Sequence, residues 1–278
     1  MAILTLSQLV AGLLPAPERV LKVGFTGEAA GEFASSFYLA GRPGAAATPS
    51  PGVNGAALTS TSLVVPGYAG QIPFPAAVAG KNIHLARLSI AQAANIGAVI
   101  VADRLWHNSG LVVTTTGAQA ITTPAWPARD ADGATSGRGV MAAIEVSTAT
   151  TNVGAVTNTT LSYTNSAGVA GRTGTIASFA ATAVAGTFVP FQLQAGDIGI
   201  QSIQSVTLGT SYGGGAIHLV AYREIADAAP VVAGVPDRLD ALGLGLPRLY
   251  DGSVPWLIYA LTGTAAGITA AFVQYAQG

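Results

Sequence analysis

Residues 201–223 read Gln-Ser-Ile-Gln-Ser-Val-Thr-Leu-Gly-Thr-Ser-Tyr-Gly-Gly-Gly-Ala-Ile-His-Leu-Val-Ala-Tyr-Arg, and this stretch decides the fold. Its first part places Ile203 in alternation with serine and glutamine, and its last part alternates around Ile217 and Leu219. Alternation over so few residues is the pattern of a β-strand, and glycines between two such runs favour a turn. The stretch therefore predicts two strands joined by a glycine-rich connection.

Similar short runs recur along the chain at intervals of about ten residues, separated by Gly, Asn, Asp and Thr. The other predicted strands are 82–90, 97–102, 111–116, 139–148, 157–164, 171–179 and 187–194. No helical period alternates with them, which argues against a parallel α/β sheet. The pattern predicts an all-β fold, an antiparallel β-sandwich of jelly-roll or Greek-key type.

The predicted sandwich occupies residues 81–278 and follows a different N-terminal region, residues 1–80. Apolar residues at helical spacing between Leu6 and Leu14 predict a short helix that ends at Pro15. The stretch 42–55 is dense in proline and glycine, which predicts an extended arm that reaches onto a neighbouring subunit.

Two further segments interrupt or end the sandwich. Residues 223–251 are rich in charge and predict a surface excursion, in which Asp237 caps a short helix stopped by Gly243. Residues 256–276 carry no charge over about the length of a membrane span. They fit either a membrane helix or two strands, 256–261 and 268–275, in a hairpin. We favour the hairpin because the rest of the chain has β periodicity.

Charge is scarce throughout the chain. Only 12 of the 278 residues are Lys or Arg and 13 are Asp or Glu, which makes 9% charged, and the mean hydropathy is +0.50. Soluble domains carry about 25% charged residues, which keep a free monomer soluble. The basic residues form no cluster, so neither nucleic acid nor a membrane is expected as a partner. The composition predicts a surface that is largely covered in an assembly.

The motifs of catalysis and metal binding are absent from the sequence. The chain has no cysteine, its three histidines have no metal-ligand spacing, and neither a nucleophile elbow nor a phosphate-binding loop occurs. Asp130-Ala-Asp-Gly133 resembles the start of a calcium loop, but Met141 stands where the closing Glu belongs. A pair of carboxylates of the glycosidase kind stays open on sequence alone. We expect no enzyme, no cofactor and no metal.

The Gly-, Ala- and Thr-rich, cysteine-free, lysine-poor β pattern with an arm ahead of it resembles structural proteins of tailed-bacteriophage virions, most of all head decoration (cement) or minor capsid proteins. The resemblance is one of composition and strand pattern along the whole chain, and it rests on no specific motif. It implies a homo-oligomer, with a trimer as one option, that binds the major capsid protein or other virion proteins and stabilises the lattice. It also implies a virion component assembled in the host cytoplasm.

Two other classes remain open: a tail-tube or tail-terminator ring protein, and a carbohydrate-binding adhesin module with exposed aromatic rings as stacking platforms. Large apolar side chains in the arm and the loops are the interface candidates, and core packing is the alternative for the tryptophans. These candidates are Leu63, Val64, Val65, Ile72, Phe74, Trp106, Trp126 and Trp256.

Overall fold

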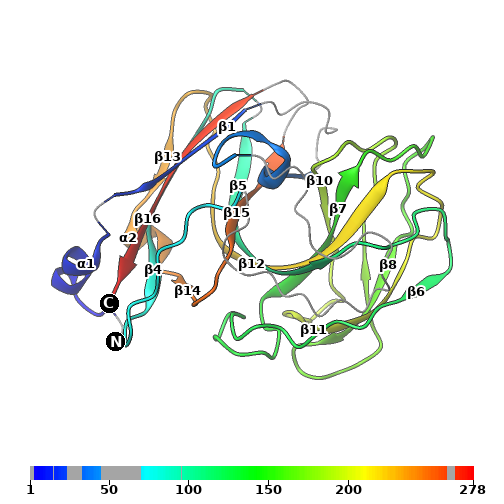
Figure 1. The fold of residues 1–278 in the computed structure, drawn as a ribbon, viewed down its shortest axis with the longest axis horizontal. Coiled ribbons are helices and arrows are strands. Elements are labelled where there is room, and N and C mark those ends of the chain that lie inside the picture. Colours follow the sequence, from blue (N-terminus) through cyan, green and yellow to red (C-terminus); the bar gives the residue numbers. More distant parts are fainter. Residues whose placement is uncertain (1–2, 15, 24–32, 45–69, 95, 262–266) are drawn as a thin grey trace.

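The computed structural model describes residues 3–14, 16–23, 33–44, 70–94, 96–261 and 267–278, which form three β layers side by side (Figure 1). A closed barrel lies in the middle, a sheet that we call sheet A lies on one side of it, and a four-stranded sheet lies on the other. Every strand pair is antiparallel. The all-β, antiparallel prediction is confirmed.

The strands of each layer are ordered as follows. Sheet A runs β13 (Asp237–Leu239), β4 (Ile83–Gln92), β16 (Ile268–Gln277), β1 (Glu18–Val23) and β3 (Ala40–Arg42), and β14 (Arg248–Leu249) also pairs with β4. The barrel runs β10 (Thr187–Pro190), β2 (Phe33–Ser35), β15 (Pro255–Leu261), β5 (Gly97–Asn108), β12 (Ala216–Ala228) and β7 (Val140–Thr148). The four-stranded sheet runs β6 (Ala118–Ala120), β11 (Ile200–Thr207), β8 (Thr160–Asn165) and β9 (Arg172–Thr175).

Three hydrophobic clusters hold these layers together. One lies between sheet A and the barrel and includes Leu88, Val101 and Val273. A second fills the barrel around Trp256, and a third, around Trp126, joins the barrel to the four-stranded sheet. Each barrel strand therefore packs side chains on both of its faces, which explains the long runs of buried residues in β5 and β12.

A bulge in β5 changes which way its side chains point. Tyr222 of β12 is opposite Arg104 and the preceding Ala221 is opposite Trp106, so Leu105 is an extra residue without a direct partner. Residues three apart in a regular strand lie on opposite faces. The extra residue instead brings Arg104 and His107 to the same face, where the Arg104 Nε donates a hydrogen bond to the His107 Nδ1.

Three segments of residues 1–80, the strands β1, β2 and β3, are built into the sheets. β1 lies between β16 and β3 in sheet A, and β2 closes the barrel between β10 and β15. Removing residues 1–80 would therefore take strands out of two layers. Of the proline- and glycine-rich stretch 42–55, only residues 42–44 are among the described residues.

The C-terminal strands form where the sequence predicts them, but they do not form a hairpin. β15 pairs with β2 and β5 in the barrel, whereas β16 pairs with β4 and β1 in sheet A. Both strands contribute to the cluster between these two layers, with Leu257 from β15 and Val273 from β16, so they pack against each other across the layers and do not pair edge to edge. Among the described residues, no helix has the length and apolarity to cross a membrane.

Two local predictions need correction. Residues 111–116 form a turn, closed by the Thr115 N–H donating to the Val112 carbonyl, and not a strand. The short helix α2 (Ala241–Leu244) is capped by Asp240 and ends at Gly245, because Asp237 is already paired in β13. The helix α1 (Leu6–Gly12) forms as expected, but Gly12 is its one buried residue, so its apolar stripe is uncovered.

Candidate functional site

The inside of the barrel holds a fully buried ion pair. The Arg104 guanidinium donates two hydrogen bonds to the Glu145 carboxylate, at 2.8 and 2.5 Å, and neither side chain is exposed. The guanidinium also lies 5.1 Å from the ring centres of both Phe37 and Trp256. Phe37 belongs to the single 3-10 turn η1 (Ser36–Tyr38), which follows β2. A paired guanidinium between two aromatic faces is a stable way to bury a cation.

Two histidines lie next to this ion pair. The ring centres of His107 and His218 are 5.8 Å apart, although the residues are far apart in sequence. Burial lowers the pKa of His218 to about 4, opposed by the Glu145 carboxylate and reinforced by Arg104. Burial, Arg104 and His218 hold the pKa of His107 well below its ordinary value. Both rings are therefore neutral near pH 7.

The ion pair also sets the protonation of its neighbours. Burial acts to raise the pKa of Glu145, but the charge and hydrogen bonds of Arg104 outweigh it and lower that pKa. Burial and the Glu145 charge raise the pKa of Tyr38. Arg104, His107, Glu145 and His218 are all 3% exposed or less, so they cannot meet a substrate without opening the barrel. We assign this cluster a structural role. No group of three or more potential metal ligands occurs among the described residues.

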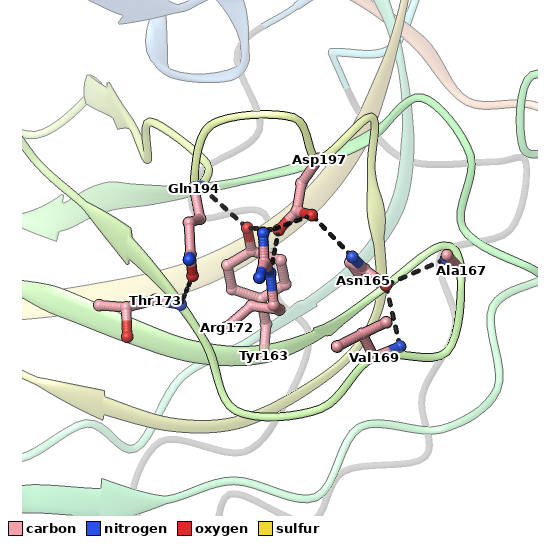
Figure 2. Close-up of polar contacts among 8 residues, drawn as sticks. All are labelled: Tyr163, Asn165, Ala167, Val169, Arg172, Thr173, Gln194 and Asp197. Atoms are coloured by element: carbon pink, nitrogen blue, oxygen red, sulfur yellow. Dashed lines mark hydrogen bonds and ion pairs between the residues drawn. The ribbon is translucent and has the colours of Figure 1, made fainter.

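A second polar network lies on the four-stranded sheet (Figure 2). Arg172 of β9 donates to both carboxylate oxygens of Asp197, at 2.9 and 3.0 Å, and the same carboxylate accepts from Tyr163 at 2.5 Å and Asn165 at 2.6 Å. Arg172 hydrogen bonding is the main cause that lowers the pKa of Asp197 to about 2. Burial and the bond to Asp197 raise the pKa of Tyr163 to about 12. The network ties β8, β9 and the loop before β11 together.

The calcium-like loop is a turn that satisfies its own carboxylate. Asp130 accepts hydrogen bonds from the backbone N–H groups of Asp132, Ala134 and Gly137 and from the Ser136 hydroxyl. Although partial burial acts to raise it, these bonds hold the pKa of Asp130 below its ordinary value. An aspartate that caps its own loop in this way explains the Asp-rich sequence without an ion.

The sequence-predicted interface residues lie mostly inside the chain. Ile72, Trp106, Trp126 and Trp256 are 0–2% exposed. The partly buried Phe74 packs edge-on against Tyr275. We therefore place the tryptophans in the core, which differs from the interface role suggested by the sequence, and none of the three indole rings is free to stack on a sugar.

Leu63, Val64 and Val65 lie outside the described residues. The distance between His107 and His218 in the sequence gives no sign that they lie close together. The register of β5 against β12 would have shown it, because His107 lies opposite Val220, two residues from His218 on the same strand.

One end of the molecule exposes no unbalanced charge. Residues 146–222, which we call the uncharged end, include β8, β9, β10 and β11 and contain Arg172 and Asp197 as their only Lys, Arg, Asp or Glu. Those two residues neutralise each other in the network of Figure 2. Apolar side chains are exposed on the same end, with Val153 99%, Ile198 62% and Val169 49% exposed. Arg138, which forms a β-bridge with Gly199 of this stretch, is itself paired with Asp132 at 2.7 Å. The charges on and next to the uncharged end are therefore few and balanced.

No family model matches this chain, and no curated protein matches it. Solved structures similar to it include that of infectious bursal disease virus Gt strain, with 11% identity over 95% of this chain and 80% of that chain and a TM-score of 0.20. Another is the VP2 subviral particle of infectious bursal disease virus, with 12% identity, 74% and 46% coverage and a TM-score of 0.15. The chain thus spans less than half the length of the second. Scores this low assign neither a fold nor a function.

Replacement of one member of the buried ion pair tests its structural role. Glu145→Gln leaves the Arg104 charge buried without its counter-charge, which costs about 3–5 kcal/mol. We expect that loss in the free energy of unfolding measured with urea. The double variant Arg104→Met with Glu145→Met removes both charges. It should lose clearly less unfolding free energy than the summed losses of the single variants Arg104→Met and Glu145→Met. A Glu145→Gln protein as stable as the wild type would contradict this role.

The buried His218 makes stability depend on pH. The folded protein keeps His218 neutral, whereas the unfolded chain takes up a proton near pH 6.5, so this contribution is complete above pH 6.5 and is lost as the pH falls towards 4. A shift from 6.5 to about 4 corresponds to about 3 kcal/mol. Unfolding free energies measured from pH 7 to 4 should fall less steeply in His218→Gln than in the wild type. Equal slopes for His218→Gln and the wild type would contradict the assignment.

Proposed function

We propose that the chain is a non-catalytic structural protein of a virion, which self-associates and binds a bacteriophage capsid lattice that it decorates and stabilises. One observation carries the proposal: the uncharged end, residues 146–222, presents apolar side chains and a single neutralised ion pair. A free monomer keeps scattered charge on its surface for solubility. A surface without it is suited to burial against other subunits, which favours a place inside an assembly.

The non-catalytic part of the proposal rests on the placement of the polar groups. The barrel cluster is sealed, the Asp130 carboxylate is used by its own loop, and the Asp197 carboxylate is held by Arg172, Tyr163 and Asn165. Catalysis needs polar groups that converge on a place a substrate can reach. These three groups of residues stabilise the layers instead.

A charge placed on the uncharged end tests the proposal. Val169 and Val78 are both 49% exposed, but Val78 precedes β4 and lies outside residues 146–222. Val169→Asp would bury an unpaired carboxylate in the assembly, so we expect at least about tenfold weaker self-association, or about 1.4 kcal/mol, by mass photometry over a dilution series. The matched control Val78→Asp should assemble as the wild type does.

The double variant Val153→Asp with Val169→Asp extends the same test. Far-ultraviolet circular dichroism should remain that of the wild type, because both side chains are at the surface. Assembly of this double variant at the wild-type concentration would show that the uncharged end is not covered, and the proposal would fall. Negative-stain micrographs of the wild-type assembly separate compact clusters, expected for a decoration protein, from open rings, expected for a tail component.

A further inference from the structure

The outer face of sheet A, which points away from the barrel, has an apolar centre. Val20, Ala271 and Val273 face the barrel in the cluster under the sheet, so the residues that alternate with them face outwards. Leu21, Ile268 and Phe272 are 45%, 47% and 41% exposed there. Leu21 is paired with Ala270, and Val23 with Ile268, so these side chains adjoin one another across β1 and β16.

Four arginines surround this centre. A single row across the sheet reads Arg238, Ser89, Phe272 and Arg19, and the Arg19 guanidinium lies 5.8 Å from the Phe272 ring centre. Arg42 is opposite Leu21 in the next row.

The fourth arginine, Arg87, is paired with Gln274. All four side chains are exposed, and none forms an ion pair within the described part of the chain. The strand positions that share this face carry no carboxylate. We call this surface the arginine face.

A separate segment of the chain, residues 224–235, has the opposite character. Its exposed carboxylates are Glu224 and Asp227, and neither forms an ion pair with another described residue. Partial burial and the Asp227 charge raise the pKa of Glu224, as expected where negative charges gather without a counter-ion. We call residues 224–235 the acidic segment.

Apolar groups accompany these charges. Val231, Val232 and Val235 are 79%, 54% and 54% exposed in the connection between β12 and β13. An open cleft of about 430 Å³ lies between the two ends of this connection, and its wall includes Ile225, Leu239 and Leu244 as well as Asp227 and Asp237. The acidic segment thus combines an apolar surface with carboxylates, as the arginine face combines one with guanidinium groups.

We propose that the arginine face of one copy of this chain docks on the acidic segment of a second copy. This inference rests on the proposed function, since it names one contact through which the protein self-associates. Arginines at the rim would meet carboxylates, and Leu21, Ile268 and Phe272 would pack on the exposed valines. An apolar centre with a charged rim is the usual anatomy of a specific protein interface, and complementary charge fixes its register.

A second copy fits this face better than nucleic acid does. Four arginines alone would attract phosphate, but a phosphate backbone offers nothing apolar to the centre formed by Leu21, Ile268 and Phe272. Val231, Val232 and Val235 of the acidic segment offer exposed apolar side chains to this centre. Because the two surfaces differ, the contact is heterologous, and it closes into a ring or is reciprocated within a dimer.

Charge reversal on each surface, followed by mixing, is the test. The face variant carries Arg19→Glu and Arg87→Glu, and the segment variant carries Glu224→Arg and Asp227→Arg. Each alone brings like charges together, so sedimentation velocity should show at least tenfold weaker self-association than the wild type. Mixed in equal amounts, the two variants present complementary charges at both contacts, and assembly should return. The control Lys81→Glu reverses an exposed charge outside both surfaces and should behave as the wild type.

The outcomes separate this inference from the proposed function. If the wild type associates, Val169→Asp weakens it and both reversal variants still assemble normally, the arginine face is not the contact while the uncharged end remains one. Failure of the two variants to bind each other when mixed, with both folded by circular dichroism, would also overturn the inference. Binding of a fluorescent duplex DNA that is lost in the face variant, with no change in protein mass, would assign the face to nucleic acid instead. A wild type that is monomeric throughout would overturn both proposals.

Discussion

The pairing of β5 with β12 is the interaction on which the rest of the structure depends. These two strands run through the barrel wall and contribute side chains to all three hydrophobic clusters. The extra residue Leu105 in β5 lets Arg104 and His107 share the barrel interior, while Trp106 packs towards the four-stranded sheet. A regular strand would have placed one of the two polar side chains in an apolar layer, where an unpaired charge is costly.

This arrangement also explains where the few charges of the chain lie. One pair, Arg104 and Glu145, is sealed inside the barrel, and a second, Arg172 and Asp197, is neutralised on the uncharged end. Exposed arginines gather on the outer face of sheet A, and exposed carboxylates gather in residues 224–235. Sheet A and the four-stranded sheet, which carries the Arg172–Asp197 pair, lie on opposite sides of the barrel (Figure 1). If other subunits cover both the outer face of sheet A and the uncharged end, these surfaces do not need scattered charge to keep the protein soluble.

Alternation along the chain was enough to predict the all-β class and most strand positions, because a half-buried strand needs an apolar residue at every second position. Partner choice was not predictable. The strands that begin at Pro255 and Ile268 look like a hairpin in sequence, yet they belong to different layers, and both pack into the cluster between those layers. The barrel cluster was missed because nothing local marks a bulge at Leu105. The tryptophans are interface candidates in the sequence because they are large and aromatic. Their burial depends on how distant segments pack, which the sequence does not show.

The central claim is that this chain is built to be covered by other subunits. The most direct test is the molar mass of the unmodified protein, measured by light scattering coupled to size exclusion at pH 7 over a range of micromolar concentrations. The account predicts a species of at least twice the 27.6 kDa chain mass that persists on dilution. A well-behaved 27.6 kDa monomer at every concentration would contradict it.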